Sequence, residues 1–115
     1  MLSYHDFSNA NVARCTSANG FNHALDIWSA SDWLTAVTGE LGEAANVVKK
    51  LNRIRDGIPG NTETEYELRE KLQKEIADTF IYLDLFAQSQ GFNLLTAAIR
   101  VFNEKSEKIG YPHRL

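Results

Sequence analysis

Four long stretches of helical periodicity constrain the fold of this 115-residue chain more than any other feature of its sequence. In each stretch apolar residues recur three or four positions apart, which is the spacing of one face of an α-helix. Both prolines, Pro59 and Pro112, lie outside these stretches, and no alternating run is bounded by turns as a strand would be. The predicted helices span about residues 8–19, 31–55, 64–90 and 93–110. The pattern therefore predicts an all-α fold, a four-helix bundle.

Capping residues and apolar stripes define the ends and the core faces of the predicted helices. Ser8 and Asn93 are suitable N-caps, and Thr64 with Glu67 three residues later forms a capping box. The predicted core faces are Leu34, Val37, Leu41, Ala44 or Ala45, Val48 and Leu51 in the second helix, Leu68, Leu72, Ile76, Phe80 and Leu83 in the third, and Leu94, Ala97 or Ala98, Val101 and Phe102 in the fourth. These faces would pack together in a single domain over residues 1–115.

The charge balance and the short apolar runs argue against several classes of protein. The net charge is −3 and no block of Lys and Arg occurs, which argues against a dedicated binder of nucleic acid polymers. The apolar run that begins at Phe80 stops at Asp84, far short of a membrane span. The N-terminus shows no secretory signal, and Cys15 is the only cysteine, which suits a reducing compartment. We therefore expect a cytoplasmic protein with no membrane segment.

Two pairs of acids carry the strongest functional signal. Glu40 and Glu43 lie in the second predicted helix, and Glu75 and Asp78 lie in the third. Each pair is spaced by three residues, so both of its members project from one face of their helix. If the two helices pack side by side, four carboxylates converge, and they repel one another unless a cation lies among them. Because every ligand would be an oxygen, the pattern predicts a hard cation, Mg²⁺, Mn²⁺ or Ca²⁺.

The surroundings of both pairs distinguish them from ordinary surface acids. Gly39 and Gly42 lie on either side of Glu40 in a helix interior, where each glycine costs roughly 1 kcal/mol relative to alanine. Such glycines indicate close approach by another backbone or by a ligand. Asp78 lies among apolar residues although aspartate is a mediocre helix former, and metal binding would explain its presence.

A hard cation held by acids on helices most often meets phosphate, and neighbouring residues suit this chemistry. Mg²⁺ takes one or two carboxylates and fills its remaining positions with substrate phosphates. Glu40 or Glu43 could orient or deprotonate the attacking water. Lys50 and Tyr82 share the acid faces of their helices and could reach phosphate oxygens. Lys50 could instead complement the helix dipole, and Tyr82 could be an ordinary residue of a helix edge.

Two tryptophans precede the first acid pair. Trp28 or Trp33 could stack on a nucleotide base. Either indole could instead pack in a core or an interface, and packing is the better explanation of Trp33. Trp28 is therefore the candidate base-binding residue.

The order of these motifs resembles that of the MazG-like nucleoside triphosphate pyrophosphohydrolases, a superfamily that includes dimeric dUTPases and dCTP pyrophosphatases. The matching stretches are residues 39–46, residues 74–82 and, less specifically, residues 101–114. The resemblance covers residues 28–115.

The resemblance implies a site and an activity. The implied metal ligands are Glu40, Glu43, Glu75 and Asp78, which would hold Mg²⁺. The implied triphosphate contacts are Tyr82, Asn103 and Lys105. The implied reaction splits a nucleoside triphosphate into a monophosphate and pyrophosphate. In many such proteins this reaction removes non-standard or surplus nucleotides, a house-cleaning role.

The third predicted helix indicates a homo-oligomer, either a dimer or a tetramer. At 1.5 Å per residue it would be roughly 40 Å long, and the first helix is too short to cover it. Phe80 and Leu83 lie on one of its faces, and Ile81, Leu85 and Phe86 lie towards others. A helix that is apolar on several sides must be buried on most of them, which a symmetric partner would achieve. The resemblance implies the same, since MazG-like proteins form dimers or dimers of dimers in which the partner closes the nucleotide pocket.

Two rival interpretations differ in function. Di-iron carboxylate bundles use a Glu-x-x-His motif, and here no histidine follows a candidate acid by three residues. The other rival is a non-enzymatic, oligomeric helical interaction module with an acidic, metal-binding groove. Release of pyrophosphate from nucleotides would separate the enzyme from the module.

Overall fold

The computed structural model describes all 115 residues and confirms the all-α prediction. It contains four α-helices, one short 3-10 helix and no strand. The helices are α1 (Tyr4–Thr16), η1 (Leu25–Ile27), α2 (Ala30–Arg55), α3 (Glu65–Ser89) and α4 (Leu94–Ile109). None of them combines the length and the apolar character that crossing a membrane requires.

The chain divides into two compact units. The hairpin unit is Ser29–Leu83, and the terminal unit consists of Met1–Trp28 together with Asp84–Leu115. The prediction of a single domain, and of one bundle that contains all four helices, stays a prediction.

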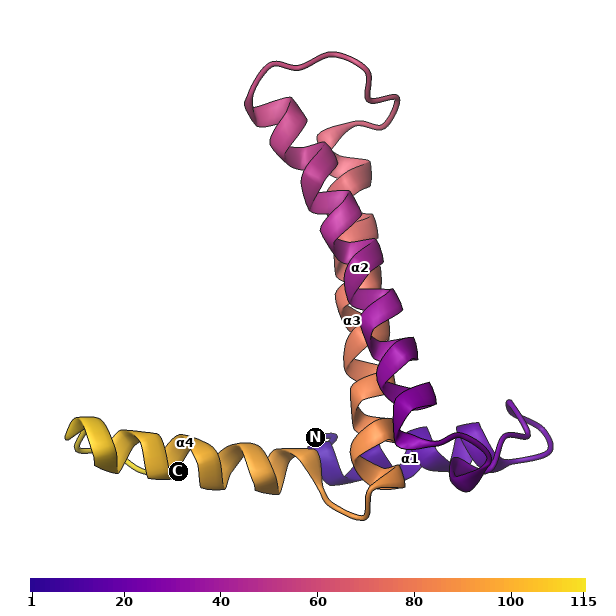
Figure 1. Cartoon of the computed structure of the whole chain (residues 1–115), viewed down its shortest axis with the longest axis vertical. Helices are drawn as coiled ribbons and strands as arrows, with labels where there is room; N and C mark the ends of the chain where they lie inside the picture. The colour runs from indigo at the N-terminus through magenta and orange to yellow at the C-terminus, as the bar shows by residue number, and fades with distance from the viewer. The chain divides into compact units, whose positions relative to one another are not determined.

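In the hairpin unit, α2 and the first part of α3 run antiparallel and are joined by a loop (Figure 1). Helix α2 begins at Ala30, one residue before the predicted residue 31, because Ser29 caps it. The Asp32 carboxylate accepts a hydrogen bond from the Ser29 backbone N–H. Thr64 and Glu67 form the predicted capping box before α3. These caps fix where the two helices start, and therefore which of their turns face one another.

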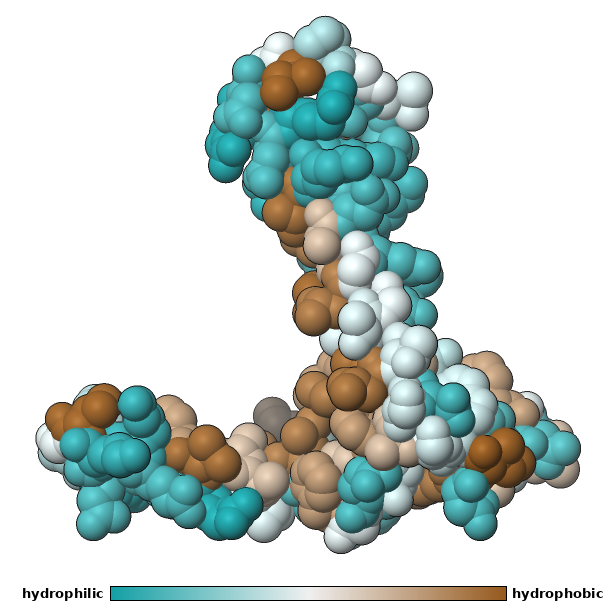
Figure 2. All heavy atoms as spheres, viewed as in Figure 1, coloured by the Kyte–Doolittle hydropathy of each residue, from teal (hydrophilic) through white to brown (hydrophobic).

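The buried face of α2 differs from the predicted stripe. Trp33, at 1% exposure, is buried together with Val37, Ala44 and Val47, so packing is confirmed for this tryptophan. Three predicted core residues of α2 and two of α3 are exposed instead: Leu34, Leu41, Val48, Ile76 and Phe80. On α2 the buried residues Trp33 and Val47 each directly precede an exposed one, Leu34 and Val48. Two neighbouring apolar stripes of this helix therefore differ in burial. Figure 2 shows hydrophobic side chains along one edge of this hairpin.

The loop between α2 and α3 is fastened to the end of α2. The Arg53 side chain donates from Nη2 to the carbonyl of Pro59 at 2.7 Å. The Arg53 backbone carbonyl accepts a hydrogen bond from the amide of Ile58 at 2.9 Å. Asn61 donates from Nδ2 to the carbonyl of Lys50 at 2.7 Å. Gly60 has a φ of 123°, a conformation that side-chain-bearing residues rarely adopt. Contacts with the end of α2 therefore hold the loop in a defined position.

In the terminal unit, α1 begins at Tyr4, four residues earlier than predicted. Ser3 is its N-cap, and Asp6 completes a capping box. Ser8, the predicted cap, is instead a buried residue inside the helix and donates a hydrogen bond from Oγ to Asp84 at 2.9 Å. The prediction that Ser8 caps α1 was wrong. A serine whose hydroxyl binds a buried acid cannot be told from an N-cap serine by its residue type alone.

Helix α4 begins after Asn93, which accepts a hydrogen bond from the amide of Thr96 as predicted for an N-cap. It ends at Gly110, which has a φ of 75°. The predicted inward face of α4 is covered only in its first part, since Leu94 and Ala97 are half-buried whereas Val101 and Phe102 are exposed; Ser106 is the buried residue of this helix.

Candidate functional site

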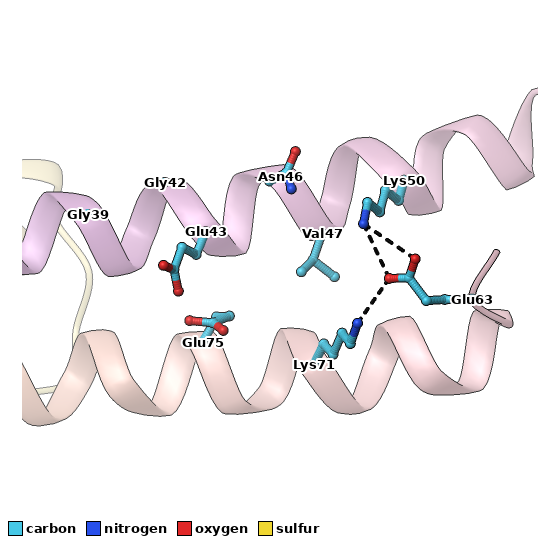
Figure 3. A pocket seen from close by; sticks show the side chains of 9 residues that line it. All are labelled: Gly39, Gly42, Glu43, Asn46, Val47, Lys50, Glu63, Lys71 and Glu75. Carbon is cyan, nitrogen blue, oxygen red and sulfur yellow. Dashed lines mark hydrogen bonds and ion pairs between the residues drawn. The ribbon is translucent and has the colours of Figure 1, made fainter. Parts of the chain in front are cut away.

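The hairpin unit brings three of the four predicted acids together. Oxygens of Glu40 and Glu43, from α2, and of Glu75, from α3, all lie within 4.8 Å of one another. Figure 3 shows the Glu43 and Glu75 carboxylates facing each other across the space between the helices. The helical spacing of three residues places Glu40 and Glu43 on one face, and the antiparallel pairing places Glu75 opposite them.

Burial and repulsion make this cluster unfavourable when all three groups are ionised. The Glu75 side chain is 15% exposed, and its Oε2 atom is buried without a hydrogen-bond partner. Desolvation raises the pKa of Glu40, and the neighbouring carboxylates raise it further. The pKa of Glu43 is also raised, because a protonated Glu43 can donate a hydrogen bond to Glu75 and because the Glu75 charge repels its own. The arrangement therefore favours a bound proton or a bound cation.

Asp78 lies one turn beyond Glu75 and has a partner of its own. Lys74 donates from Nζ to Asp78 Oδ2 at 2.9 Å and lies 3.8 Å from Glu75 Oε1. The hydrogen bond to Asp78 and the attraction of the surrounding acids raise the pKa of Lys74. Lys74 therefore neutralises part of the site without a metal ion.

An open cavity of about 490 Å³ adjoins the acid cluster. Its lining is formed by Gly39, Gly42, Glu43, Asn46, Val47, Lys50, Glu63, Lys71 and Glu75 (Figure 3). A Cβ atom added to Gly39 or to Gly42 would meet no atom of the chain within 4 Å. No backbone of this chain therefore approaches these glycines, and close approach by a ligand or a partner chain stays a prediction.

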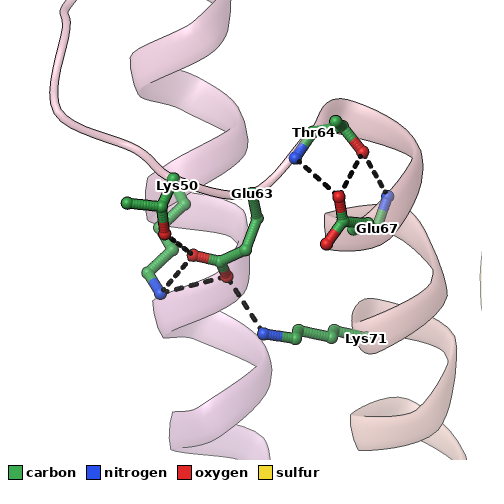
Figure 4. A network of polar contacts seen from close by, with 6 residues as sticks. Lys50, Glu63, Thr64, Glu67 and Lys71 are labelled. Carbon is green, nitrogen blue, oxygen red and sulfur yellow. Dashed lines mark hydrogen bonds and ion pairs between the residues drawn. The ribbon is translucent and has the colours of Figure 1, made fainter.

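Two lysines and a glutamate form the end of the cavity furthest from Glu43. Glu63, from the loop before α3, lies between Lys50 of α2 and Lys71 of α3 (Figure 4). The nitrogen–oxygen distances are 3.3 Å to Lys50 and 3.1 Å to Lys71. The hydrogen bonds from Lys71 and from Lys50 lower the pKa of Glu63. The cavity thus joins a negative cluster to a positive one.

The remaining predicted substrate residues are divided between the two units. Tyr82 is half-buried on α3, four residues beyond Asp78. Trp28, Asn103 and Lys105 belong to the terminal unit, and their participation in the site stays a prediction.

Two of these terminal-unit residues have contacts that the sequence did not reveal. The Trp28 ring packs edge-on against His23, with ring centroids 4.7 Å apart. Asn103 binds the backbone of Leu115, accepting from its amide at 2.9 Å and donating to its carbonyl at 3.3 Å.

Sequence reasoning missed three charged residues near the acids, namely Lys74, Lys71 and Glu63. Lys74 could have been found, because it precedes Asp78 by four residues and such pairs meet on a helix surface. Lys71 stands in the same relation to Glu75. Glu63 lies in a loop, and no periodic pattern predicts where a loop side chain points.

Comparison with known proteins gives no match: no family model, no curated protein and no solved structure is significantly similar to the chain.

Proposed function

We propose that the chain is a Mg²⁺-dependent nucleoside triphosphate pyrophosphohydrolase, which splits its substrate into a monophosphate and pyrophosphate. The observation that carries this proposal is the convergence of Glu40, Glu43 and Glu75 within 4.8 Å beside an open cavity. The resemblance of the two acid motifs to those of MazG-like proteins supports it. A house-cleaning role in the cytoplasm, on non-standard or surplus nucleotides, is part of the proposal.

The residues present fit a hard divalent cation. All donors are carboxylate oxygens, and the buried Oε2 of Glu75 has no hydrogen-bond partner within the chain. Asp78 would complete the predicted set of four ligands once Lys74, which is exposed, turns away. When bound, Mg²⁺ would neutralise phosphate charge that the acids alone would repel. Mn²⁺ suits the same ligands.

The chain's own residues would divide the remaining work. Whichever of Glu40 and Glu43 is not committed to the cation would orient the attacking water and accept its proton. The raised pKa of each group makes it a better proton acceptor than an ordinary glutamate. Lys50 and Tyr82 would bind phosphate oxygens in the hairpin unit. The part of Trp28, Asn103 and Lys105, which belong to the terminal unit, in substrate binding stays a prediction.

A homo-oligomer, a dimer or a tetramer, is also part of the proposal. Leu34, Leu41 and Val48 are spaced seven residues apart on α2, so they form one apolar stripe, and the stripe is exposed. Val101 and Phe102 form a second exposed apolar set on α4. Partner chains would cover these surfaces.

The direct test is incubation with a panel of canonical and modified deoxynucleoside triphosphates and Mg²⁺, followed by assay of pyrophosphate. We expect release that stops when the metal is chelated. Glu43→Gln and Asp78→Asn should each lower turnover roughly 100-fold or more, because a catalytic metal supplies several kcal/mol of stabilisation. Glu70→Gln, at an exposed glutamate on the same helix as Asp78, is the matched control and should leave turnover unchanged.

Two outcomes would contradict the proposal. Near-normal turnover in both Glu43→Gln and Asp78→Asn would refute the assignment of the acids. The absence of pyrophosphate with every nucleotide would favour the alternative, a non-enzymatic oligomeric module with an acidic groove.

A further inference from the structure

The contact between Glu63 and two lysines lies inside the cavity that adjoins the acid cluster. Glu63, Lys50 and Lys71 line this cavity together with Glu43 and Glu75. The Glu63 side chain is 16% exposed, so its carboxylate occupies the space between the lysines and is not merely close to them on an open surface. Thr62 donates a further hydrogen bond to Glu63 Oε1 at 3.3 Å. A carboxylate therefore fills the only part of the cavity wall that is positively charged.

The spacing along the helices relates the lysines to the acids. Lys50 follows Glu43 by seven residues on α2, which is about 10 Å along the axis, and Lys71 precedes Glu75 by four residues, which is about 6 Å. Lysine side chains are long and flexible and can shorten these distances further. A chain of phosphates bound at the acids through a cation would thus extend towards both lysines.

The loop does not depend on the Glu63 contacts for its position. Arg53, Ile58, Pro59 and Asn61 already fasten it to the end of α2, and the Thr64 cap fixes the start of α3. One carboxylate also leaves the two lysines with a net charge of +1. A phosphate carries more negative charge and more acceptor oxygens than a carboxylate, so it would compete well for both lysines.

We propose that Lys50 and Lys71 form a binding subsite for the terminal phosphates of the substrate, and that Glu63 occupies this subsite until a phosphate chain displaces it. The inference rests on the proposed function for the identity of the substrate, and it adds Lys71 and Glu63 to the site. Glu63 acts as an internal competitor that keeps weakly charged anions out. Only an anion with several phosphates pairs with both lysines and with a cation at the acids at the same time.

The test is calorimetric titration with inorganic tripolyphosphate in the presence of a chelator, so that no metal contributes to binding. Glu63→Gln should bind tripolyphosphate about tenfold more tightly than the wild-type chain, since two partly exposed ion pairs no longer compete. Adding Lys71→Gln to Glu63→Gln should abolish this gain. Glu65→Gln is the matched control, because it removes the same charge and also releases a cation, Arg69, but lies outside the cavity. It should bind as the wild type does.

Equal affinity of Glu63→Gln and the wild type, or an equal gain in Glu65→Gln, would overturn the inference.

Hydrogen exchange of the wild-type chain provides a second measurement that needs no variant. Tripolyphosphate should increase amide exchange only at residues 62 and 63, which lie between the Asn61 attachment and the Thr64 cap, because the displaced Glu63 side chain no longer holds them. Unchanged exchange there would also refute displacement. The nucleotide assay distinguishes the two proposals. Pyrophosphate release with no effect of Glu63→Gln refutes the subsite alone, whereas the predicted binding without any hydrolysis refutes the proposed function alone.

Discussion

At the scale of single residues, Glu75 differs from the other acids of the site because one of its oxygens is buried and has no hydrogen-bond partner. Burying an ionised carboxylate is costly unless a counter-charge or a hydrogen bond compensates. Lys74 compensates from one side at 3.8 Å, but it is exposed and shared with Asp78. The residual cost makes the site receptive to a cation. Its own burial raises the pKa of Glu40, and the hydrogen bond with Glu75 raises that of Glu43.

These raised pKa values predict how pH acts on the free and the metal-bound chain. Without metal, the folded state holds protons on Glu40 and Glu43 that the unfolded chain releases. The free energy of unfolding therefore increases as pH falls from above the raised values towards the ordinary value near 4.5. Protons compete with Mg²⁺, so the stabilisation by Mg²⁺ should shrink over the same fall in pH.

Thermal melting with and without Mg²⁺ between about pH 5 and pH 8 measures this effect. The increase in Tm caused by Mg²⁺ should be largest at the alkaline end. An increase that is constant, or that grows as pH falls, would contradict the metal assignment. Glu43→Gln should reduce both the metal effect and its dependence on pH.

Asp84 is a second acid with an unusual environment, but its role is structural. It is fully buried in the terminal unit and accepts hydrogen bonds from Tyr4, Ser8, Asn11 and Gln88. Burial alone would raise the pKa of Asp84, but these hydrogen bonds lower it below its ordinary value of 3.8. The stability that they provide is present above pH 3.8 and is lost as pH falls through the lowered pKa.

Asp84→Asn should destabilise the chain by about 2–3 kcal/mol, because the new amide points a donor at groups that are themselves donors. Chemical denaturation at neutral pH measures the change. The control is Asp26→Asn, at an exposed position of the same unit, which should change stability little. A cost below about 0.5 kcal/mol for Asp84→Asn would show that the network contributes little.

At the scale of elements, helix number and type followed from the sequence, but two helix starts did not. Thr64 with Glu67 was recognisable as a capping box because it has the expected residues, and the structure confirms it. Ser3 with Asp6 and Ser29 with Asp32 use aspartate in the third position. Ser8 was a plausible cap in sequence although Ser3 is the cap in the structure, and the local sequence alone does not decide between two nearby serines.

The burial of particular faces was less predictable than the helices themselves. Two apolar series run along α2, one through Val37 and Ala44 and the other through Leu34 and Leu41. Periodicity identifies both as stripes but cannot tell which one faces α3. Helix geometry fixed the spacing within each acid pair, whereas the packing of the two helices brought Glu40, Glu43 and Glu75 together and left Asp78 outside the cluster.

Gly42 provides a test of the cavity at this scale. An added Cβ would meet no atom of the chain, so Gly42→Ala should stabilise α2 by about 0.5–1 kcal/mol in the free chain. If the substrate occupies the cavity that Gly42 lines, the added methyl group should at the same time raise KM.

Thermal melting and steady-state kinetics measure the two effects. A higher Tm with unchanged kinetics would show that no ligand approaches Gly42. The corresponding control is Ala45→Gly on the exposed side of α2, which should lower Tm and leave KM unchanged.

At the scale of the whole molecule, the exposed apolar residues require an explanation. Leu41 is 52% exposed, and its apolar neighbours in the stripe on α2, Leu34 and Val48, are exposed as well. Such contiguous surfaces are typical of interfaces between chains. Whether an apolar stripe packs within one chain or between two chains depends on the partner, which a single sequence does not specify.

Light scattering coupled to gel filtration should therefore detect a dimer or a tetramer of the 13.0 kDa chain. Leu41→Lys should shift the particle towards the monomer, because a charge cannot be buried in an apolar interface without a partner. Glu70→Lys, on an exposed polar face of α3, is the control and should leave the mass unchanged. A wild-type monomer that keeps full activity at high dilution would refute the oligomer.

The central claim is that Glu40, Glu43 and Glu75 form a metal-dependent centre that breaks the bond between the α- and β-phosphates of a nucleotide. Phosphorus NMR of a deoxynucleoside triphosphate incubated with the wild-type chain and Mg²⁺ follows that bond directly. The account predicts that a nucleoside monophosphate and pyrophosphate form in equimolar amounts, so that their phosphorus resonances grow in a 1:2 ratio of intensity, and that both are absent with a chelator or with Glu43→Gln. Growth of orthophosphate and diphosphate resonances, or hydrolysis that persists without metal, would contradict it.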